Sequence, residues 1–276
     1  MPPSASAATL DLFSGAIDGR RPASFWRFAG SPPPGSGRTP VLAVAGLGLD
    51  GRVFSTLAPL AAGRDLVLVN LPNELPSSST MEDMAAVAME ALDAAGHAGR
   101  PAVILGSSFG GMVALAAALA RPERTAALVR IGTAPSWALV STGLRIAARL
   151  HGLIPRRAYP RVFSTLMLPP SRYGNPKIRE GLRVQMFHRT KGFMGACLES
   201  IRGFDATPRL GGIRAPTLIL HGDDDPVLPP PAGAAMAAGI PGAVHVRIPS
   251  CGHLPHVSLP DFTAECVGKF LAERGL

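Results

Sequence analysis

Short apolar segments alternate with longer helical segments along most of this chain. Six segments are predicted to be strands because they are rich in Val, Ile, Leu and Ala: residues 41–45, 66–69, 102–105, 127–131, 217–220 and 244–248. The middle ones are almost continuously apolar, which is typical of strands that are buried on both faces of a sheet. The alternation predicts an α/β fold, with a mostly parallel, doubly wound sheet and helices on both of its faces.

Helix signals lie between these strands. Thr80 and Asp83 form a start like a capping box, and the helix that follows is predicted to run to residue 95. Two more helices are predicted at residues 110–121 and 260–273.

Two segments precede the first parallel strand. Residues 9–13 and 24–28 are predicted to form an antiparallel hairpin at the sheet edge, turning at Gly19. Residues 30–40 are rich in Pro, Gly and Ser, which predicts a surface loop.

The alternation breaks in the middle of the chain. Residues 135–208 are predicted to form a helical cap inserted into an α/β core that consists of residues 1–134 and 209–276. Four short amphipathic helices are expected in the cap, at residues 139–150, 158–168, 177–188 and 193–201. The cap is rich in Leu, Met and Phe, and these side chains could line an apolar acyl pocket or simply pack the cap.

The net charge of +8 is concentrated in the cap. Residues 136–208 hold ten arginines and two lysines against three acidic residues. One interpretation is a face that meets an acidic carrier or another anionic group, and the other is a solvated arginine-rich surface. Nucleic-acid binding is not predicted, because aromatic residues are not interleaved with these basic ones.

A glycine-rich stretch follows the strand at residues 102–105. Gly106-Ser107-Ser108-Phe109-Gly110 has the form G-x-S-x-G, in which a very tight turn presents the middle residue and needs small neighbours. Ser108 is therefore the candidate nucleophile, with Gly106 and Gly110 as the elbow glycines. The alternative is an ordinary glycine-rich turn between a strand and a helix, of which a phosphate-binding turn is one kind, but the stretch lacks a following Lys-Ser/Thr and the pattern G-x-G-x-x-G.

A serine nucleophile needs a base and a carboxylate that orients the base. On this fold the expected chain order is Ser, Asp or Glu, then His. Asp225 is the candidate acid, because it follows a buried strand and precedes Pro226. Its neighbours Asp223 and Asp224 are expected to form the turn or to be solvated.

Three histidines follow Asp225 in the sequence. His253 lies in the loop between the last strand and the last helix, where a side chain can reach the end of the sheet, so it is the candidate base. His256 is the alternative in the same loop. His245 alternates with valines inside a strand, so a structural role is expected for it.

A tetrahedral oxyanion needs two convergent N–H donors. The backbone N–H groups of Phe109 and Leu47 are the candidates, because Phe109 follows the nucleophile and Leu47 lies in the loop after the first parallel strand.

Taken together, these residues resemble the α/β-hydrolase superfamily, and the resemblance covers nearly the whole chain. Two stretches depart from the family pattern. Ala45 stands where the loop with the oxyanion donor usually begins with His, and residues 70–77 replace the usual Asp-x-Pro-Gly-His-Gly-x-Ser. The missing His removes a side chain that often braces the loop. The serine nucleophile excludes the epoxide hydrolases and haloalkane dehalogenases of the family.

The resemblance implies a serine carboxylesterase or lactonase that needs no cofactor and no metal and acts on a small-molecule ester or lactone through an acyl-enzyme. An acyltransferase or a C–C bond hydrolase would use the same triad, and a non-catalytic binding protein of this fold is a further alternative. The cap also resembles that of esterases acting on acyl-carrier-protein esters, and an acidic carrier would suit its charge.

A cytoplasmic location is expected. The three cysteines, Cys197, Cys251 and Cys266, are odd in number and widely spaced, which fits a reducing compartment better than a disulfide framework. A membrane span is not predicted, because no apolar run reaches about 18 residues. A secretory signal is not predicted either, because residues 1–8 lack a basic start and an apolar region.

Overall fold

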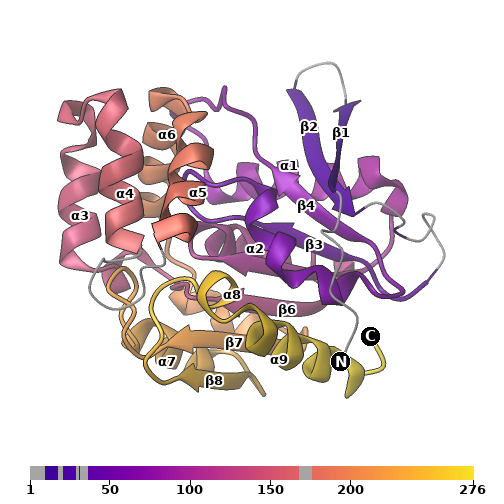
Figure 1. Ribbon diagram of the computed structural model, residues 1–276. Helices are drawn as coiled ribbons and strands as arrows, with labels where there is room; N and C mark the ends of the chain where they lie inside the picture. Colours follow the sequence, from indigo (N-terminus) through magenta and orange to yellow (C-terminus); the bar gives the residue numbers. More distant parts are fainter. Residues whose placement is uncertain (1–9, 18–20, 29–30, 32–36, 168–175) are drawn as a thin grey trace.

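A computed structural model describes residues 10–17, 21–28, 31, 37–167 and 176–276. Eight strands form one sheet in the order β1-β2-β4-β3-β5-β6-β7-β8 (Figure 1). Their bounds are β1 Leu10–Ile17, β2 Arg21–Phe28, β3 Val41–Val44, β4 Leu66–Asn70, β5 Ala102–Ser107, β6 Thr125–Ile131, β7 Thr217–Gly222 and β8 Val244–Ile248. The strands β3 to β8 pair in parallel, whereas β1 and β2 form an antiparallel hairpin that joins the sheet at β4.

This architecture confirms the predicted fold class. Every residue of β3, β5 and β7 is buried, which is what nearly continuous apolar strands require. In β8 at the edge of the sheet, by contrast, only Ile248 is buried. The predicted turn at Gly19 and most of the predicted loop at residues 30–40 lie outside the described residues.

Helices cover the sheet on both sides. Figure 1 shows α9 (Pro260–Ala272) in front of the sheet and α1 (Met81–Leu92) and α2 (Phe109–Ala120) behind it. The short helices α7 (Pro231–Gly239) and α8 (Pro255–Ser258) and the 3-10 segment η1 (Gly51–Ala61) complete the core elements.

The predicted start of α1 is present in the structure. The N–H of Asp83 donates to the Thr80 hydroxyl at 3.1 Å, and the Asp83 carboxylate accepts the Thr80 N–H at 2.8 Å. The regular helix ends at Leu92, and a single wider turn continues to His97 with Gly96 at a φ of 88°. The helix therefore ends three residues before the predicted residue 95.

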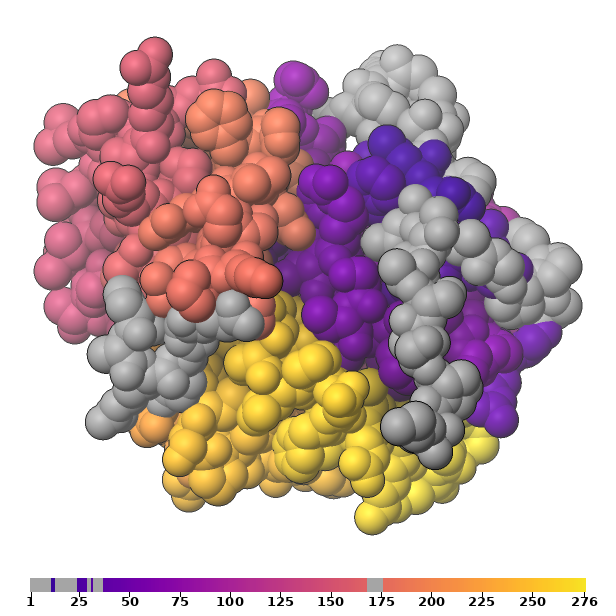
Figure 2. All heavy atoms as spheres, in the orientation of Figure 1, coloured from indigo at the N-terminus to yellow at the C-terminus, as the bar shows by residue number. Residues whose placement is uncertain are grey.

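The described residues between β6 and β7 form four α-helices: α3 (Thr142–Arg149), α4 (Tyr159–Met167), α5 (Pro176–Phe187) and α6 (Lys191–Gly203). In Figure 2 the rose and orange atoms of these helices pack against the purple and yellow atoms of the core. An isolated antiparallel bridge between Ser136 and Asp205 joins the two ends of this segment. These helices agree with the four expected ones, while the division into a core and a cap at residues 135 and 208 stays a prediction.

Within the described parts of the chain, we find no helix with both the length and the apolar character needed to cross a bilayer. The cytoplasmic location stays a prediction.

Candidate active site

Ser108 connects the end of β5 to the start of α2 in a strained backbone conformation. Its φ is 55° and its ψ is −122°, a region that residues with a side chain rarely adopt. Two hydrogen bonds from the neighbouring strand hold it there. The Ser108 N–H donates to the Ile131 carbonyl at 2.9 Å, and the Thr133 hydroxyl donates to the Ser108 carbonyl at 2.7 Å. Backbone strain of this kind concentrates at functional sites.

The glycines around Ser108 have no room for a side chain. A Cβ at Gly106 would overlap the Gly110 carbonyl, and a Cβ at Gly110 would overlap the Val44 carbonyl. On the other side, a Cβ at Gly46 would lie 3.4 Å from the Cβ of Ser108. The turn therefore has room only for glycine at Gly106 and Gly110, and it also packs against the loop after β3.

His253 and Asp225 join Ser108 in one chain of hydrogen bonds. The Nε2 atom of His253 lies 2.8 Å from the Ser108 hydroxyl oxygen, and its Nδ1 lies 2.8 Å from Oδ2 of Asp225. The other Asp225 oxygen accepts the backbone N–H groups of Val227 at 2.8 Å and Leu228 at 2.9 Å. The Ser108, Asp225 and His253 residues are 6%, 4% and 0% exposed, so solvent screens these contacts little.

This arrangement assigns the protons of His253. A carboxylate only accepts hydrogen bonds, so the Nδ1 atom that faces Asp225 carries the proton and donates it. The neutral ring then has a free lone pair on Nε2, which accepts the hydroxyl proton of Ser108. Such a histidine can take a proton from the serine oxygen as that oxygen attacks an electrophile.

The other candidate histidines lie elsewhere. His256 is fully buried with its ring centroid 5.1 Å from that of Phe54, and neither ring nitrogen has a hydrogen-bond partner among the described residues. Burial lowers its pKa to about 3, so its ring is neutral. His245 is half-buried in β8, and burial also lowers its pKa. The structure therefore brings only His253 of these three to Ser108.

The neighbouring aspartates take part in the turn after β7. Asp223 forms an ion pair with Arg247 at 2.9 Å, and the Asp224 N–H donates to the Cys251 carbonyl at 3.0 Å. Of the three aspartates, Asp225 is the one whose carboxylate lies 2.8 Å from Nδ1 of His253.

His221 is a buried neighbour of this site that the sequence analysis did not single out. Its Nε2 lies 2.7 Å from the Leu228 carbonyl, so that nitrogen carries the proton, and it lies 3.8 Å from Oδ2 of Asp225. Burial lowers the pKa of His221, which keeps the ring neutral. It supports the loop that donates two N–H groups to Asp225. Its position at the buried end of β7 is the only signal that could have indicated this role.

The two candidate oxyanion donors are Phe109 and Leu47. Phe109 is the first residue of α2, so its N–H has no partner inside the helix. Leu47 lies in a tight turn after β3, in which the Leu49 N–H donates to the Gly46 carbonyl at 3.0 Å and Gly48 has a φ of 76°. Leu47 and Phe109 line the same pocket as Ser108.

That pocket lies between the core and the helices α3, α4 and α6, and it measures about 400 Å³ when the space open to solvent is included. Its lining combines residues from the core with residues from the inserted helices: Leu47, Ser108, Phe109, Met112, Val140, Leu144, Phe163, Leu166, Met167, Ile201, Val227 and Leu228. Every residue in this lining except Ser108 is apolar. The described residues include no group of three or more His, Cys, Asp or Glu side chains placed to hold a metal ion.

Comparison with known proteins agrees with this architecture. Residues 41–266 match the model of the alpha/beta hydrolase family. The chain is 29% identical over 227 residues to the pimeloyl-[acyl-carrier protein] methyl ester esterase of Chromobacterium violaceum, covering 79% of this chain and 88% of that one.

Solved structures show the same fold. A thermophilic esterase from Thermogutta terrifontis has a TM-score of 0.78 at 26% identity, covering 96% of this chain and 99% of that one. The enol-lactonase from Burkholderia xenovorans LB400 has a TM-score of 0.81 at 19% identity, covering 94% and 99%. This chain therefore belongs to the alpha/beta hydrolase family, as an esterase- or lactonase-like member.

Proposed function

We propose that the protein is a serine hydrolase that cleaves carboxylic esters or lactones, with Ser108, His253 and Asp225 as its catalytic triad. The observation that carries this proposal is the unbroken hydrogen-bond chain from Asp225 through His253 to Ser108. The strained turn at Ser108 supports it, because it presents the hydroxyl at the end of the sheet beside an apolar pocket.

In the proposed mechanism, the Ser108 oxygen attacks the substrate carbonyl while Nε2 of His253 takes the hydroxyl proton. The carbonyl oxygen becomes an oxyanion that accepts hydrogen bonds from the N–H groups of Leu47 and Phe109. Asp225 keeps the ring of His253 oriented and stabilises the imidazolium.

The tetrahedral intermediate then collapses to an acyl-enzyme. The bond to the alcohol oxygen breaks, and His253 returns its proton to that oxygen. Water repeats the sequence on the acyl-enzyme and releases the carboxylic acid with Ser108 restored. In a lactone the alcohol and the acid are parts of one molecule, so a hydroxy acid is the product. No step calls for a cofactor, and independence from cofactors stays part of the proposal.

The apolar lining of the pocket favours a substrate whose acyl group, the part next to Ser108, is apolar. Its described lining contains no charged side chain, so a carboxylate or ammonium group placed there would lose its hydration without a partner. Because Leu144, Phe163 and Ile201 come from the inserted helices, we also propose that residues 135–208 act as a cap over the site.

A carrier-bound ester is a second candidate substrate. Arg149, Arg156, Arg157 and Arg161 are exposed on the cap, and this charge would attract an acidic carrier. A relative named for an acyl-carrier-protein ester is in keeping with this candidate.

Kinetics on a panel of p-nitrophenyl esters and lactones, comparing wild type with Ser108→Ala, tests the proposed function. We expect turnover in wild type and none above background in the variant. Addition of an alcohol or amine acceptor separates hydrolysis from acyl transfer, because only a transferase forms the new ester or amide. Ligand binding without turnover by wild type would contradict catalysis and favour a binding protein.

A further inference from the structure

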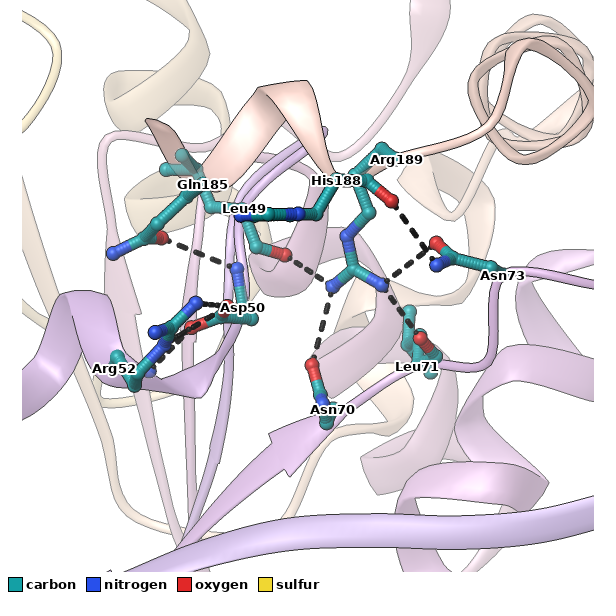
Figure 3. A network of polar contacts seen from close by, with 9 residues as sticks. All are labelled: Leu49, Asp50, Arg52, Asn70, Leu71, Asn73, Gln185, His188 and Arg189. Carbon is teal, nitrogen blue, oxygen red and sulfur yellow. Dashed lines mark hydrogen bonds and ion pairs between the residues drawn. The ribbon is translucent and has the colours of Figure 1, made fainter. Parts of the chain in front are cut away.

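Arg189 lies on the short link between α5 and α6 in the cap, and it reaches two loops of the core (Figure 3). One guanidinium nitrogen, Nη2, donates to the Leu49 carbonyl at 2.8 Å and to Oδ1 of Asn70 at 3.3 Å. The other, Nη1, donates to the Leu71 carbonyl at 2.8 Å and to Oδ1 of Asn73 at 3.2 Å. A single cap side chain therefore ties the loop after β3 to the loop after β4.

The position of this guanidinium is closely determined. Arg189 is 8% exposed, and its charge lies 4.5 Å from the centre of the Phe193 ring. Asn73 holds the link on both sides of Arg189, because its side-chain N–H donates to the His188 carbonyl at 3.2 Å and its own carbonyl accepts the Thr190 hydroxyl at 3.1 Å. The nitrogen that meets Leu49 is thereby fixed relative to the core.

Burying the charged guanidinium of Arg189 costs free energy that a purely structural contact would not need to cost. In the described part of the chain, the four hydrogen-bond acceptors of Arg189 are neutral oxygens, so none of these bonds is to a carboxylate. Burial lowers the pKa of Arg189, and the nearby Asp50 carboxylate opposes that effect. In some proteins a buried charged group is kept because it fixes a specific geometry, even though its burial costs stability.

The loop that Arg189 meets is the one that carries the proposed oxyanion donor. Leu49 is two residues beyond Leu47, in the turn that begins at Gly46. Ala45 gives this loop no polar side chain of its own. Gln185 of α5 makes a second contact, because its side-chain oxygen accepts the Asp50 N–H at 3.3 Å (Figure 3). The cap thus supplies polar contacts that hold the loop after β3.

We infer that Arg189 is a positioning residue for the reaction: by holding the Leu49 carbonyl from the cap, it keeps the Leu47 N–H directed at the developing oxyanion. The inference rests on the proposed function, since it needs Leu47 to donate in the transition state. Arg189 acts through Leu49 and does not touch the reacting atoms.

The test compares two inhibitors of matched chain length in wild type, Arg189→Met and Arg189→Lys. An alkyl trifluoromethyl ketone adds to Ser108 and forms an oxyanion, whereas the plain alkyl methyl ketone binds as a ground-state analogue. In Arg189→Met we expect kcat on p-nitrophenyl esters to fall about 10- to 100-fold, below the loss for a deleted donor. The inhibition constant of the trifluoromethyl ketone should rise by the same factor, while KM and the methyl ketone constant change less than about threefold.

Arg189→Lys should fall between wild type and Arg189→Met, because one ammonium cannot span both loops. The matched control is Arg202→Met, which removes an exposed arginine of α6 paired with Glu199 at 2.8 Å and should leave all constants unchanged. Unchanged kcat and trifluoromethyl ketone binding in a folded Arg189 variant would overturn the inference. Equal weakening of both ketones would also overturn it, since that indicates a distorted pocket.

Thermal melting followed by circular dichroism checks folding, and where Arg189→Met does not fold, Arg189→Lys is judged by the same criteria. Fluorophosphonate labelling of Ser108 tests the proposed function separately. If the wild-type protein is not labelled, the triad itself is refuted. If the wild type is labelled but the Arg189 variants keep its kcat and its trifluoromethyl ketone binding, only the positioning role is refuted.

Discussion

The carboxylate of Asp225 lies 2.8 Å from Nδ1 of His253, although 28 residues separate them in the chain. In the Asp225→Asn variant, one amide oxygen can still accept the Val227 and Leu228 N–H groups. The amide nitrogen would then face Nδ1 and donate to it, which places the imidazole proton on Nε2 and removes the base that Ser108 needs. We expect kcat to fall about 10³- to 10⁴-fold with little change in fold.

Asp223→Asn is the matched control for this variant. It changes a carboxylate in the same turn, whose ion pair with the exposed Arg247 contributes little. Steady-state kinetics should show Asp223→Asn within about twofold of wild type, because the carboxylate of Asp223 is paired with Arg247 and not with His253. Equal activity of the two variants would argue against Asp225 as the triad acid.

The buried ring of His256 should make the folded protein less stable in acid. Its pKa is about 3 in the folded protein and close to 6.5 when unfolded, because burial opposes the charged ring. Between pH 6.5 and 3 the unfolded chain therefore binds a proton that the folded one does not, so the free energy of unfolding falls as the pH falls. The slope is about 1.4 kcal/mol per pH unit in that window and is absent above it.

The His256→Leu variant isolates this contribution, because other groups titrate alike in both proteins. Urea unfolding at several pH values should show the wild type losing free energy of unfolding relative to the variant below pH 6.5. Parallel curves for the two proteins would mean that His256 takes up its proton when folded.

Two glycines at helix positions should respond in opposite ways to alanine. In Gly110→Ala the new Cβ would overlap the Val44 carbonyl, so we expect a loss of about 3 kcal/mol or more, or failure to fold. Gly181 of α5 has nothing within 4 Å of its Cβ position, so Gly181→Ala should stabilise the protein by about 0.5–1 kcal/mol. Urea unfolding measures both, and equal effects would mean that the turn around Ser108 is not tightly packed.

The apolar pocket predicts that acyl length can be controlled from the cap. Leu166 of α4 lines the pocket, so Leu166→Trp should fill part of it and lower kcat/KM for octanoate more than for acetate esters. We expect the ratio of kcat/KM for octanoate esters to kcat/KM for acetate esters to change by about tenfold. Leu153→Trp, at an 81% exposed position of the same cap, should leave the ratio unchanged. The same ratio in both variants would place the acyl chain elsewhere.

Much of the core follows from local sequence patterns. The six predicted parallel strands are present, and the continuous apolar runs among them, β3, β5 and β7, are fully buried inside the covered sheet. The capping residues Thr80 and Asp83 start α1 as expected. The elements that were not predicted include η1 and α7, because Pro59 interrupts the helical pattern of the first and the second is almost entirely Ala, Gly and Pro.

The contacts within the site could be predicted only in part. The turn at Ser108 is a local feature, and the chain order of Asp225 and His253 follows from the sheet topology. The role of Arg189 could not be predicted, because its partner Leu49 is 140 residues away and accepts with a backbone carbonyl, which leaves no mark on the sequence. Similarly, nothing in the composition distinguishes the ring of His256, which is buried without a partner, from a catalytic one.

Covalent labelling tests the central claim most directly. A fluorophosphonate probe reacts with a serine only when a base activates it, and mass spectrometry of the digest identifies the modified residue. We predict stoichiometric labelling of Ser108 in wild type, none in Ser108→Ala, and much slower labelling in His253→Ala. Equal labelling of wild type and Ser108→Ala, or modification at another residue, would contradict the account.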